Sequence, residues 1–122
     1  MGQSVGAANT KCPRLSDRVS AIFAMRLKQA RDLRGLSQRA LGALVDKDND
    51  KNRGAARINR YEQRVNLADM EKAGELAKAL NVPLAYLFAE SEDLAEMILA
   101  FEGLDEAQRA KVLADMKQRN KG

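Results

Sequence analysis

The sequence contains no histidine, and Cys12 is its one cysteine among 122 residues. Without histidine the chain lacks the commonest general base and the usual nitrogen ligand of metals. No nucleophile elbow, phosphate-binding loop or plausible carboxylate pair compensates for that absence. A lone cysteine cannot form an intramolecular disulfide, which fits a reducing compartment. We therefore expect a cytoplasmic protein that is not an enzyme and that uses neither a metal nor another cofactor.

Long apolar runs and aromatic residues are also scarce. No apolar segment approaches the roughly twenty residues that a membrane helix needs, and no signal peptide is recognisable. The chain has three Phe, two Tyr and no Trp. Valine and isoleucine are few, whereas Ala, Leu, Lys, Arg, Glu and Gln dominate, which favours helices over strands. We expect an all-α protein without a membrane association. Its length leaves no room for a separate sensing domain, so a small-molecule effector is not expected.

Helical periodicity and capping residues predict seven helices. Ser16, Ser37, Asp69, Ser91 and Asp105 are the expected N-caps, and Asp105 with Gln108 has the pattern of a capping box. The predicted helices run from Ser16 to Gly35, Ser37 to Val45, Gly54 to Glu62, Asp69 to Leu80, Pro83 to Phe88, Ser91 to Gly103 and Asp105 to Met116. The segment 46–53 has no apolar residue and is predicted to be a solvated loop.

The same spacing predicts which side chains face the core. These are Val19, Ile22, Phe23, Leu27, Ala30 and Leu33 in the first helix, Leu41, Leu44 and Val45 in the second, Ile58 and Tyr61 in the third, Met70, Ala73, Leu76, Ala77 and Leu80 in the fourth, and Leu84, Leu87 and Phe88 in the fifth. Gly42 in the second helix is expected to permit a close helix crossing.

Charge is distributed unevenly along the chain. Residues 1–66 carry fourteen Lys and Arg against six Asp and Glu, while residues 67–122 carry seven against eleven. A basic front half joined to an acidic back half is typical of a surface that faces phosphates, followed by a region that does not. The simpler alternative is that these charges only solvate the outer faces of helices.

Four runs occur in an order typical of a known domain: 26–41 (RLKQARDLRGLSQRAL), 58–62 (INRYE), 69–71 (DME) and 77–87 (AKALNVPLAYL). Together they resemble the helix-turn-helix domain of the lambda-repressor and Cro-like (XRE-type) transcriptional regulators over about residues 23–88. The resemblance implies a five-helix repressor-like helix-turn-helix domain over 16–90. A flexible arm over 1–15 would precede it, and a C-terminal two-helix extension over 91–122 would follow.

The resemblance implies a transcriptional regulator, for instance a repressor, that binds double-stranded DNA with residues 54–63 in the major groove. It places base-reading residues near the start of this recognition helix and on its exposed face, where the sequence has Ala55, Ala56, Arg57, Asn59 and Arg60. Ser37 and Gln38 at the start of the second helix would meet a phosphate, assisted by the helix dipole. Gln63 and Arg64 would be further phosphate contacts.

Some of these residues have structural alternatives. Arg57 could pair with Glu62 or with an acidic loop residue, and Asn59 could only cap or solvate. Glu62 is interpreted as a structural partner, since a carboxylate facing phosphate would oppose binding.

The chain departs from the family in two places. About six extra residues lie in the 46–53 region, and they either follow the DNA backbone through Lys47, Lys51 and Arg53 or lengthen the start of the recognition helix. The family often has Gly and Pro in the loop after that helix, where this chain has Arg64 and Ala68.

The 46–53 region also suggests calcium binding, because Asp46, Asp48 and Asp50 open an EF-hand-like pattern. However, Lys51 and Arg57 occupy the positions where that loop needs Gly and Glu. A solvated turn is the preferred interpretation.

The two predicted C-terminal helices have apolar stripes that need a cover. We predict that they form a homodimer interface through Leu94, Met97, Ile98 and Phe101 together with Val112, Leu113 and Met116. Alternatively, the extension folds back over the first and fifth helices. A different function is also open: a helical protein-interaction module, for example antitoxin-like, in which the acidic half recruits a protein and DNA binding is weak or vestigial.

Overall fold

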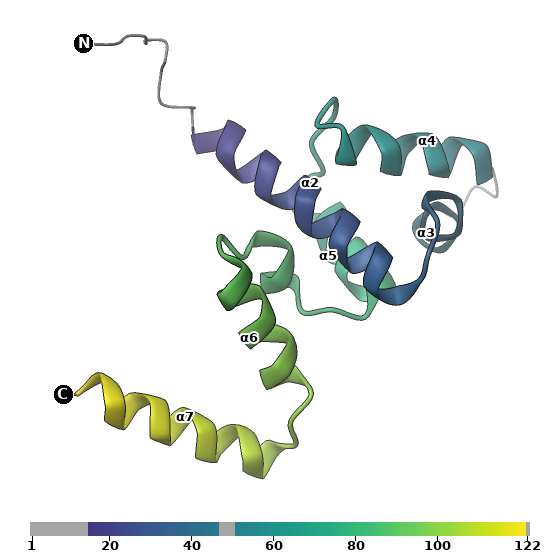
Figure 1. Cartoon of the computed structure of the whole chain (residues 1–122). Coiled ribbons are helices and arrows are strands. Elements are labelled where there is room, and N and C mark those ends of the chain that lie inside the picture. The colour runs from purple at the N-terminus through teal and green to yellow at the C-terminus, as the bar shows by residue number, and fades with distance from the viewer. Residues whose placement is uncertain (1–14, 47–50, 122) are drawn as a thin grey trace, which may run out of the picture.

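A computed structural model describes residues 15–46 and 51–121, in which every regular element is a helix (Figure 1). The elements are α2 (Leu15–Arg34), α3 (Gln38–Val45), α4 (Lys51–Glu62), α5 (Met70–Leu80), the 3-10 helix η1 (Leu84–Phe88), α6 (Glu92–Glu102) and α7 (Glu106–Asn120). The prediction of an all-α helix-turn-helix domain with a two-helix extension is confirmed. The fifth helix of the domain is a 3-10 helix, with Pro83 preceding its first residue.

Four of the five predicted N-caps are confirmed. Ser37, Asp69, Ser91 and Asp105 each accept a hydrogen bond from a backbone N–H three residues further along, over 2.8–3.1 Å. The capping box at Asp105 is complete, because the side chain of Gln108 accepts from the Asp105 N–H at 3.1 Å. Ser16 was predicted wrongly as a cap. The α2 helix begins one residue earlier at Leu15, itself a favourable helix former.

The core lies where α2 crosses the other helices of the domain. Its fully buried members are Leu27, Ala30, Leu41, Ile58, Leu76, Leu80 and Leu87. Residues from α2, α3, α4, α5 and η1 therefore contribute to one cluster. This packing places α3 and α4 side by side at one edge of the domain (Figure 1).

Several residues predicted to face the core are exposed instead. Met70 is 85% exposed, and the others are Val19, Leu33, Leu44, Leu84 and Phe88. Met70 is the first residue of α5, and Leu33 is close to the end of α2. Phe88 keeps one apolar contact, because its ring centre lies 5.6 Å from that of Phe23. Helical periodicity predicts which side of a helix faces the core. It does not predict how far along the helix the neighbouring helices cover that side.

The prediction of a loop over 46–53 is wrong in its second half. The α4 helix begins at Lys51, so residues 51–53 lengthen α4 at its start. Hydrogen bonding favours this, because a continued helix satisfies within the chain the N–H and C=O groups that a loop would leave to water. Residues 47–50, which include Lys47, and residues 1–14 of the predicted arm lie outside the described residues.

The extension leaves the domain through α6 and turns back through α7 (Figure 1). Ala95 is the buried residue of α6, and Ile98 and Leu99 are partly buried against the core. Arg109 stabilises the α6–α7 turn by donating to the carbonyls of Phe101 and Glu102 at 3.1 and 2.6 Å. None of the residues of α7 is buried. In the described part of the chain, no helix is long and apolar enough to cross a membrane.

Candidate nucleic-acid interface

Two glycines bring α3 and α4 into backbone contact. A Cβ atom on Gly42 would lie 2.4 Å from the carbonyl carbon of Gly54, and a Cβ on Gly54 would lie 2.9 Å from that of Gly42. Atoms at such distances overlap, so any larger residue would push the helices apart. The expected close crossing at Gly42 is confirmed, and its partner Gly54 was not predicted. The contact holds α4 at a short, defined distance from α3.

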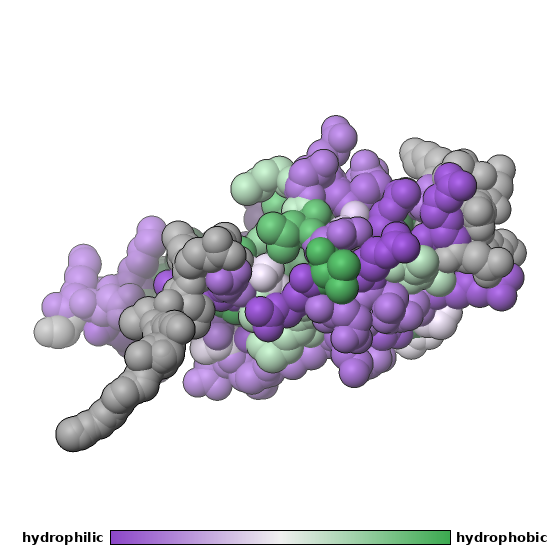
Figure 2. Space-filling model, turned by 90° about the horizontal axis from the view of Figure 1, so that it is seen from above, coloured by the Kyte–Doolittle hydropathy of each residue, from purple (hydrophilic) through white to green (hydrophobic). Residues whose placement is uncertain are grey.

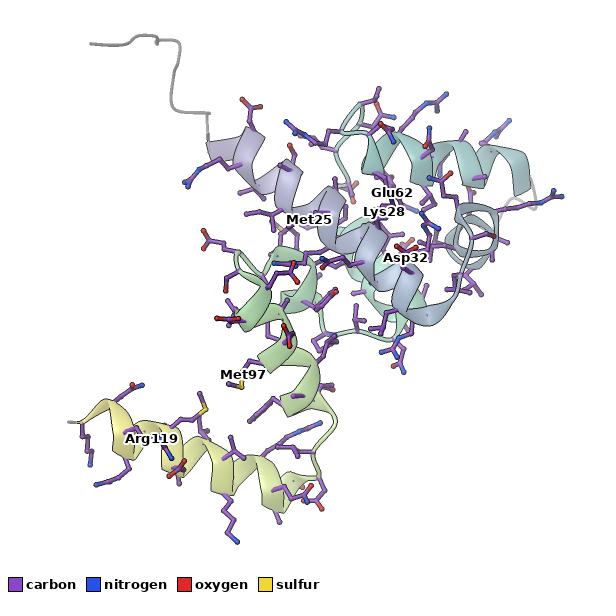
Figure 3. The ribbon with its side chains drawn as sticks, viewed as in Figure 1. Met25, Lys28, Asp32, Glu62, Met97 and Arg119 are labelled. Carbon is purple, nitrogen blue, oxygen red and sulfur yellow. The ribbon has the colours of Figure 1, made fainter. Side chains whose placement is uncertain are left out.

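An ion pair anchors the C-terminal end of α4 to α2. The Arg31 guanidinium binds both oxygens of Glu62, with Nε–Oε2 at 2.8 Å and Nη2–Oε1 at 3.1 Å. The Glu62 side chain is 4% exposed and lies between α4 and α2 (Figure 3). Its hydrogen bond to Arg31 raises the pKa of that guanidinium above its usual value. The structural role predicted for Glu62 is confirmed, although the sequence analysis did not identify Arg31 as its partner.

Gln38 connects the beginning of α3 to the same pair. Its Nε2 amide donates to Glu62 Oε1 at 3.0 Å and to Asn59 Oδ1 at 3.2 Å. The Ser37 hydroxyl accepts from the Ala40 N–H at 3.0 Å as the N-cap of α3. The polar ends of both side chains are therefore engaged within the domain. The first backbone N–H groups of α3 lack partners within the helix, and Ser37 accepts from one of them, that of Ala40.

The outer side of α4 carries exposed polar residues. Arg53, Asn59 and Arg60 are exposed along the helix, and Gln63 and Arg64 are exposed just after it. Ala55 and Ala56 are half-buried on the same helix. Figure 2 looks onto the side on which α4 lies, and hydrophilic residues cover most of that view. These residues form one surface, which we call the α4 face: Arg53, Ala55, Ala56, Asn59, Arg60, Gln63 and Arg64.

Arg57 has a partner at the end of α3. Its Nη1 lies 3.0 Å from Oδ2 of Asp46, whose side chain is 10% exposed, while Arg57 itself is 36% exposed. Asp46 is also the C-cap residue of α3, and its N–H donates to the Gly42 carbonyl. The alternative in which Arg57 pairs with an acidic residue of the loop is therefore what the structure shows. Among the described residues, the Arg60 side chain has no such ion pair.

Arg64 ends α4 in the left-handed conformation, with φ at 63°. The Val65 N–H donates to the Arg60 carbonyl at 2.8 Å, and the Arg64 N–H donates to that of Tyr61 at 3.1 Å. Glycine is the usual residue at this position of a helix end. The substitution noted in the sequence thus leaves the turn intact, at the cost of placing a non-glycine residue in the left-handed region.

Two further arginines organise the domain, and neither was predicted to do so. Arg34 binds the carbonyls of Leu80 and Asn81 at 2.8 Å each, at the end of α5. Arg26 is fully buried beneath η1 and α6. A signal for Arg26 was present, because it interrupts the apolar stripe between Phe23 and Ala30. No comparable local signal marks Arg34.

A metal site receives no support from the described residues, where no group of three or more His, Cys, Asp or Glu side chains could hold an ion. Asp48 and Asp50 of the calcium alternative lie outside the described residues. Asp46, the first of that series, forms an ion pair with Arg57.

Comparison with solved structures gives a match to a protein of named function. The crystal structure of the transcriptional regulator BswR is similar to this chain with a TM-score of 0.72 and 36% sequence identity. The match covers 78% of this chain and 92% of that protein. A scan of protein-family models and a search of curated proteins give no match.

Proposed function

The chain belongs to the family of the transcriptional regulator BswR, and we propose that it regulates transcription by binding double-stranded DNA in a sequence-specific manner. In this proposal α4 is the recognition helix and enters the major groove. The observation that carries it is the contrast between the two sides of α4. One side is held by the Gly42–Gly54 contact and the Arg31–Glu62 pair, while the α4 face carries exposed hydrogen-bonding side chains.

The α4 face offers side chains suited to base edges. An α-helix fits the major groove, which is about 12 Å wide. Arg60 can donate two hydrogen bonds to guanine O6 and N7, and Asn59 can bind adenine N6 and N7. Ala55 and Ala56 suit a thymine methyl group or a close approach of the helix. Arg57 is the weaker candidate for a base contact, because it would first have to leave Asp46.

Phosphate contacts would fix the position of α4 without reading sequence. The N-terminus of α3, capped by Ser37 and followed by Gln38, presents backbone N–H groups and the positive end of a helix dipole. Arg53 near the start of α4 and Gln63 and Arg64 after its end flank the proposed base-reading residues. We assign these residues to the DNA backbone.

A homodimer would supply the second recognition helix. The apolar residues of the extension remain uncovered in the single chain: Leu94, Met97, Leu113 and Met116 are 38–48% exposed. Met97 points away from α6 on the side where α7 lies (Figure 3). Phe101 and Val112 are half-buried, and Ile98 already packs in part against the core. We call the uncovered set Leu94, Met97, Leu113 and Met116 the extension face, and we propose that a second copy covers it.

Selection of bound sites from a random pool of double-stranded DNA tests the proposal. We expect an inverted repeat whose half-sites lie about one helical turn apart, because a symmetric dimer presents two recognition helices. The selected DNA should then bind in fluorescence anisotropy at least 1,000-fold more tightly than unrelated DNA at the same salt concentration.

The protein-interaction alternative makes the opposite prediction. A chain whose helix-turn-helix is vestigial would enrich no sequence and would bind all DNA weakly, with an affinity that disappears as salt is raised. That result would contradict the proposed function.

A further inference from the structure

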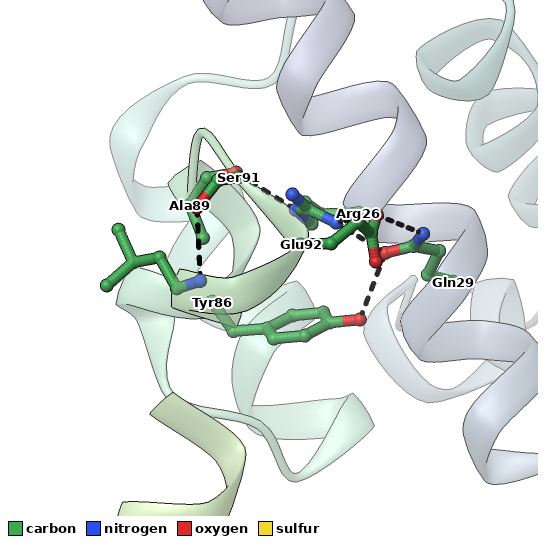
Figure 4. Close-up of polar contacts among 7 residues, drawn as sticks. Arg26, Gln29, Tyr86, Ala89, Ser91 and Glu92 are labelled. Atoms are coloured by element: carbon green, nitrogen blue, oxygen red, sulfur yellow. Dashed lines mark hydrogen bonds and ion pairs between the residues drawn. The ribbon is translucent and has the colours of Figure 1, made fainter. Parts of the chain in front are cut away.

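Arg26 is a charged residue buried in the domain, with 0% of its surface exposed. Its Nε donates to the carbonyl of Ala89 at 2.9 Å, and its Nη1 lies 2.6 Å from Oε1 of Glu92 and 2.7 Å from Oε1 of Gln29. Gln29 Nε2 also donates to Glu92 Oε1 at 2.9 Å. Figure 4 shows this group, which we call the Arg26 cluster: Arg26, Gln29, Ala89 and Glu92.

The Arg26 cluster connects the domain to the first turn of the extension. Arg26 and Gln29 belong to α2, Ala89 follows η1, and Glu92 is the first residue of α6. The Tyr86 hydroxyl of η1 adds a longer hydrogen bond of 3.4 Å to Gln29. Hydrogen bonds from Gln29 and Arg26 lower the pKa of Glu92. Three helices are therefore joined at the point where α6 leaves the domain.

Stability alone does not explain a buried arginine at this point. Replacing a buried ion pair with apolar residues of similar volume is often neutral or stabilising. Moreover, the carboxylate partner is 60% exposed, so the pair gains less than one shielded from water. Unlike an apolar side chain, a guanidinium fixes the direction in which its partners lie, because its donors bind only acceptors placed in its plane.

Apolar contacts leave the direction of α6 loosely defined. The helix buries Ala95 and partly buries Ile98 and Leu99, all on one stripe. A helix that is held along a single stripe of contacts can change its tilt about that stripe. The α7 helix adds no constraint, because none of its residues is buried and Arg109 ties it to the end of α6. The extension therefore moves with α6.

We propose that the Arg26 cluster positions α6 relative to α2 and thereby sets the spacing of the two DNA half-sites that the dimer recognises. Arg26 and Glu92 are positioning residues in this account, remote from DNA. The inference rests on the proposed function, because spacing has meaning only if two copies bind DNA through α4 and associate through the extension face.

The geometry makes the effect large enough to matter. An eleven-residue helix such as α6 is about 16 Å long, so a tilt of roughly 20° moves its far end by about 6 Å. One base pair occupies about 3.4 Å along the DNA axis. A loosened α6 would thus spread the half-site separation over about two base pairs.

Glu92→Ala is the test variant, and Asp93→Ala is its matched control. Both residues are exposed acids in the first turn of α6, and Glu92 is the one that binds Arg26. Binding is measured on the selected inverted repeat and on versions with one or two base pairs inserted or removed between the half-sites. Wild type and Asp93→Ala should prefer one spacing by at least tenfold, whereas Glu92→Ala should prefer it by less than about threefold. Affinity for a single half-site should be equal in all three proteins.

A distance measurement separates this inference from the proposed function. In a Cys12→Ser background, spin labels at Lys28→Cys on α2 and Ala100→Cys on α6 report the angle between these helices, with excess unlabelled protein to dilute pairs between copies. Glu92→Ala and the apolar variant Arg26→Met should broaden the distance distribution, and Asp93→Ala should not. Unchanged distributions in both variants would overturn the inference even if DNA binding holds. Broadened distributions in a protein that selects no DNA would instead refute the proposed function, and the spacing role with it.

Discussion

Gly42 of α3 and Gly54 of α4 meet backbone against backbone, at a place where a Cβ on Gly42 would lie 2.4 Å from the Gly54 carbonyl carbon. The atom in the way belongs to the main chain and cannot rotate aside. The position of α4, and with it the α4 face, therefore depends on the absence of two side chains. This relationship gives the first prediction.

Gly42→Ala should destabilise the domain by about 2 kcal/mol or more, because overpacking typically costs about 1–3 kcal/mol and here no side chain can yield. Gly74→Ala is the matched control, since a Cβ on Gly74 of α5 meets nothing within 4 Å. That variant should gain roughly 0.5–1 kcal/mol from helix propensity. Urea unfolding followed by circular dichroism measures both. Equal stabilities of the two variants would show that α3 and α4 can separate at little cost.

Glu62→Gln should lower the free energy of unfolding by about 1.5–3 kcal/mol, the range for a hydrogen bond to a charged group. The variant leaves the Arg31 guanidinium, whose side chain is 13% exposed, beside a neutral amide. Glu71→Gln is the control, because Glu71 is exposed on α5. Urea unfolding again provides the measurement. A Glu62→Gln protein as stable as the control would mean that the ion pair does not anchor α4.

Arg64→Gly should separate stability from DNA binding. Glycine adopts the φ of 63° without a Cβ penalty, so we expect the free energy of unfolding to rise by roughly 0.5–1 kcal/mol. Loss of one phosphate contact in each copy should reduce the slope of log affinity against log salt concentration by about two for the dimer on its inverted repeat. Arg64→Lys should leave the slope unchanged and gain no stability. An Arg64→Gly protein with the wild-type slope would remove Arg64 from the DNA interface.

The double variant Met97→Asp/Leu113→Asp should dissociate the proposed dimer. Both residues are exposed, at 45% and 46%. Ile98 is left unchanged, because it packs against the core and its substitution would alter the stability of the fold as well as the association. A loss of about 1.4 kcal/mol for each of the two substitutions, summed over both copies, corresponds to an approximately 100-fold weaker dimer. Sedimentation equilibrium measures the association, with Lys111→Asp on α7 as the control. A double variant that remains dimeric, or a wild type that is monomeric at tens of micromolar, would place the interface elsewhere.

Local signals made most of the helices predictable from the sequence. The caps at Ser37, Asp69 and Asp105 act within one turn of the chain, so a pattern of three or four residues is enough to identify them. Burial was less predictable, because it depends on where a neighbouring helix ends. Met70 has the spacing of a core residue, yet it is the first residue of α5 and is 85% exposed.

The candidate site was likewise predictable where the signal is local and not where it depends on distant residues. The family resemblance located the α4 face, but the contacts that hold α4 join residues far apart in the chain. Arg31 and Glu62 are separated by 31 positions, and Arg26 and Glu92 by 66. No local pattern encodes such pairs, since many arginines and carboxylates could be matched. The start of α4 at Lys51 was missed because a polar segment without apolar residues gives no periodicity.

Base reading by α4 is the central claim, and Arg60→Ala tests it most directly. Its affinity for the selected DNA site, and for every single base-pair variant of that site, is measured by fluorescence anisotropy at fixed salt beside wild type and the remote control Lys117→Ala. We predict that Arg60→Ala weakens binding by about 1–3 kcal/mol for each half-site and loses discrimination at one base pair of each half-site, as expected when a forked contact to guanine is removed. Lys117→Ala should match wild type at every position. An Arg60→Ala protein that keeps both its affinity and its full sequence preference would contradict the account.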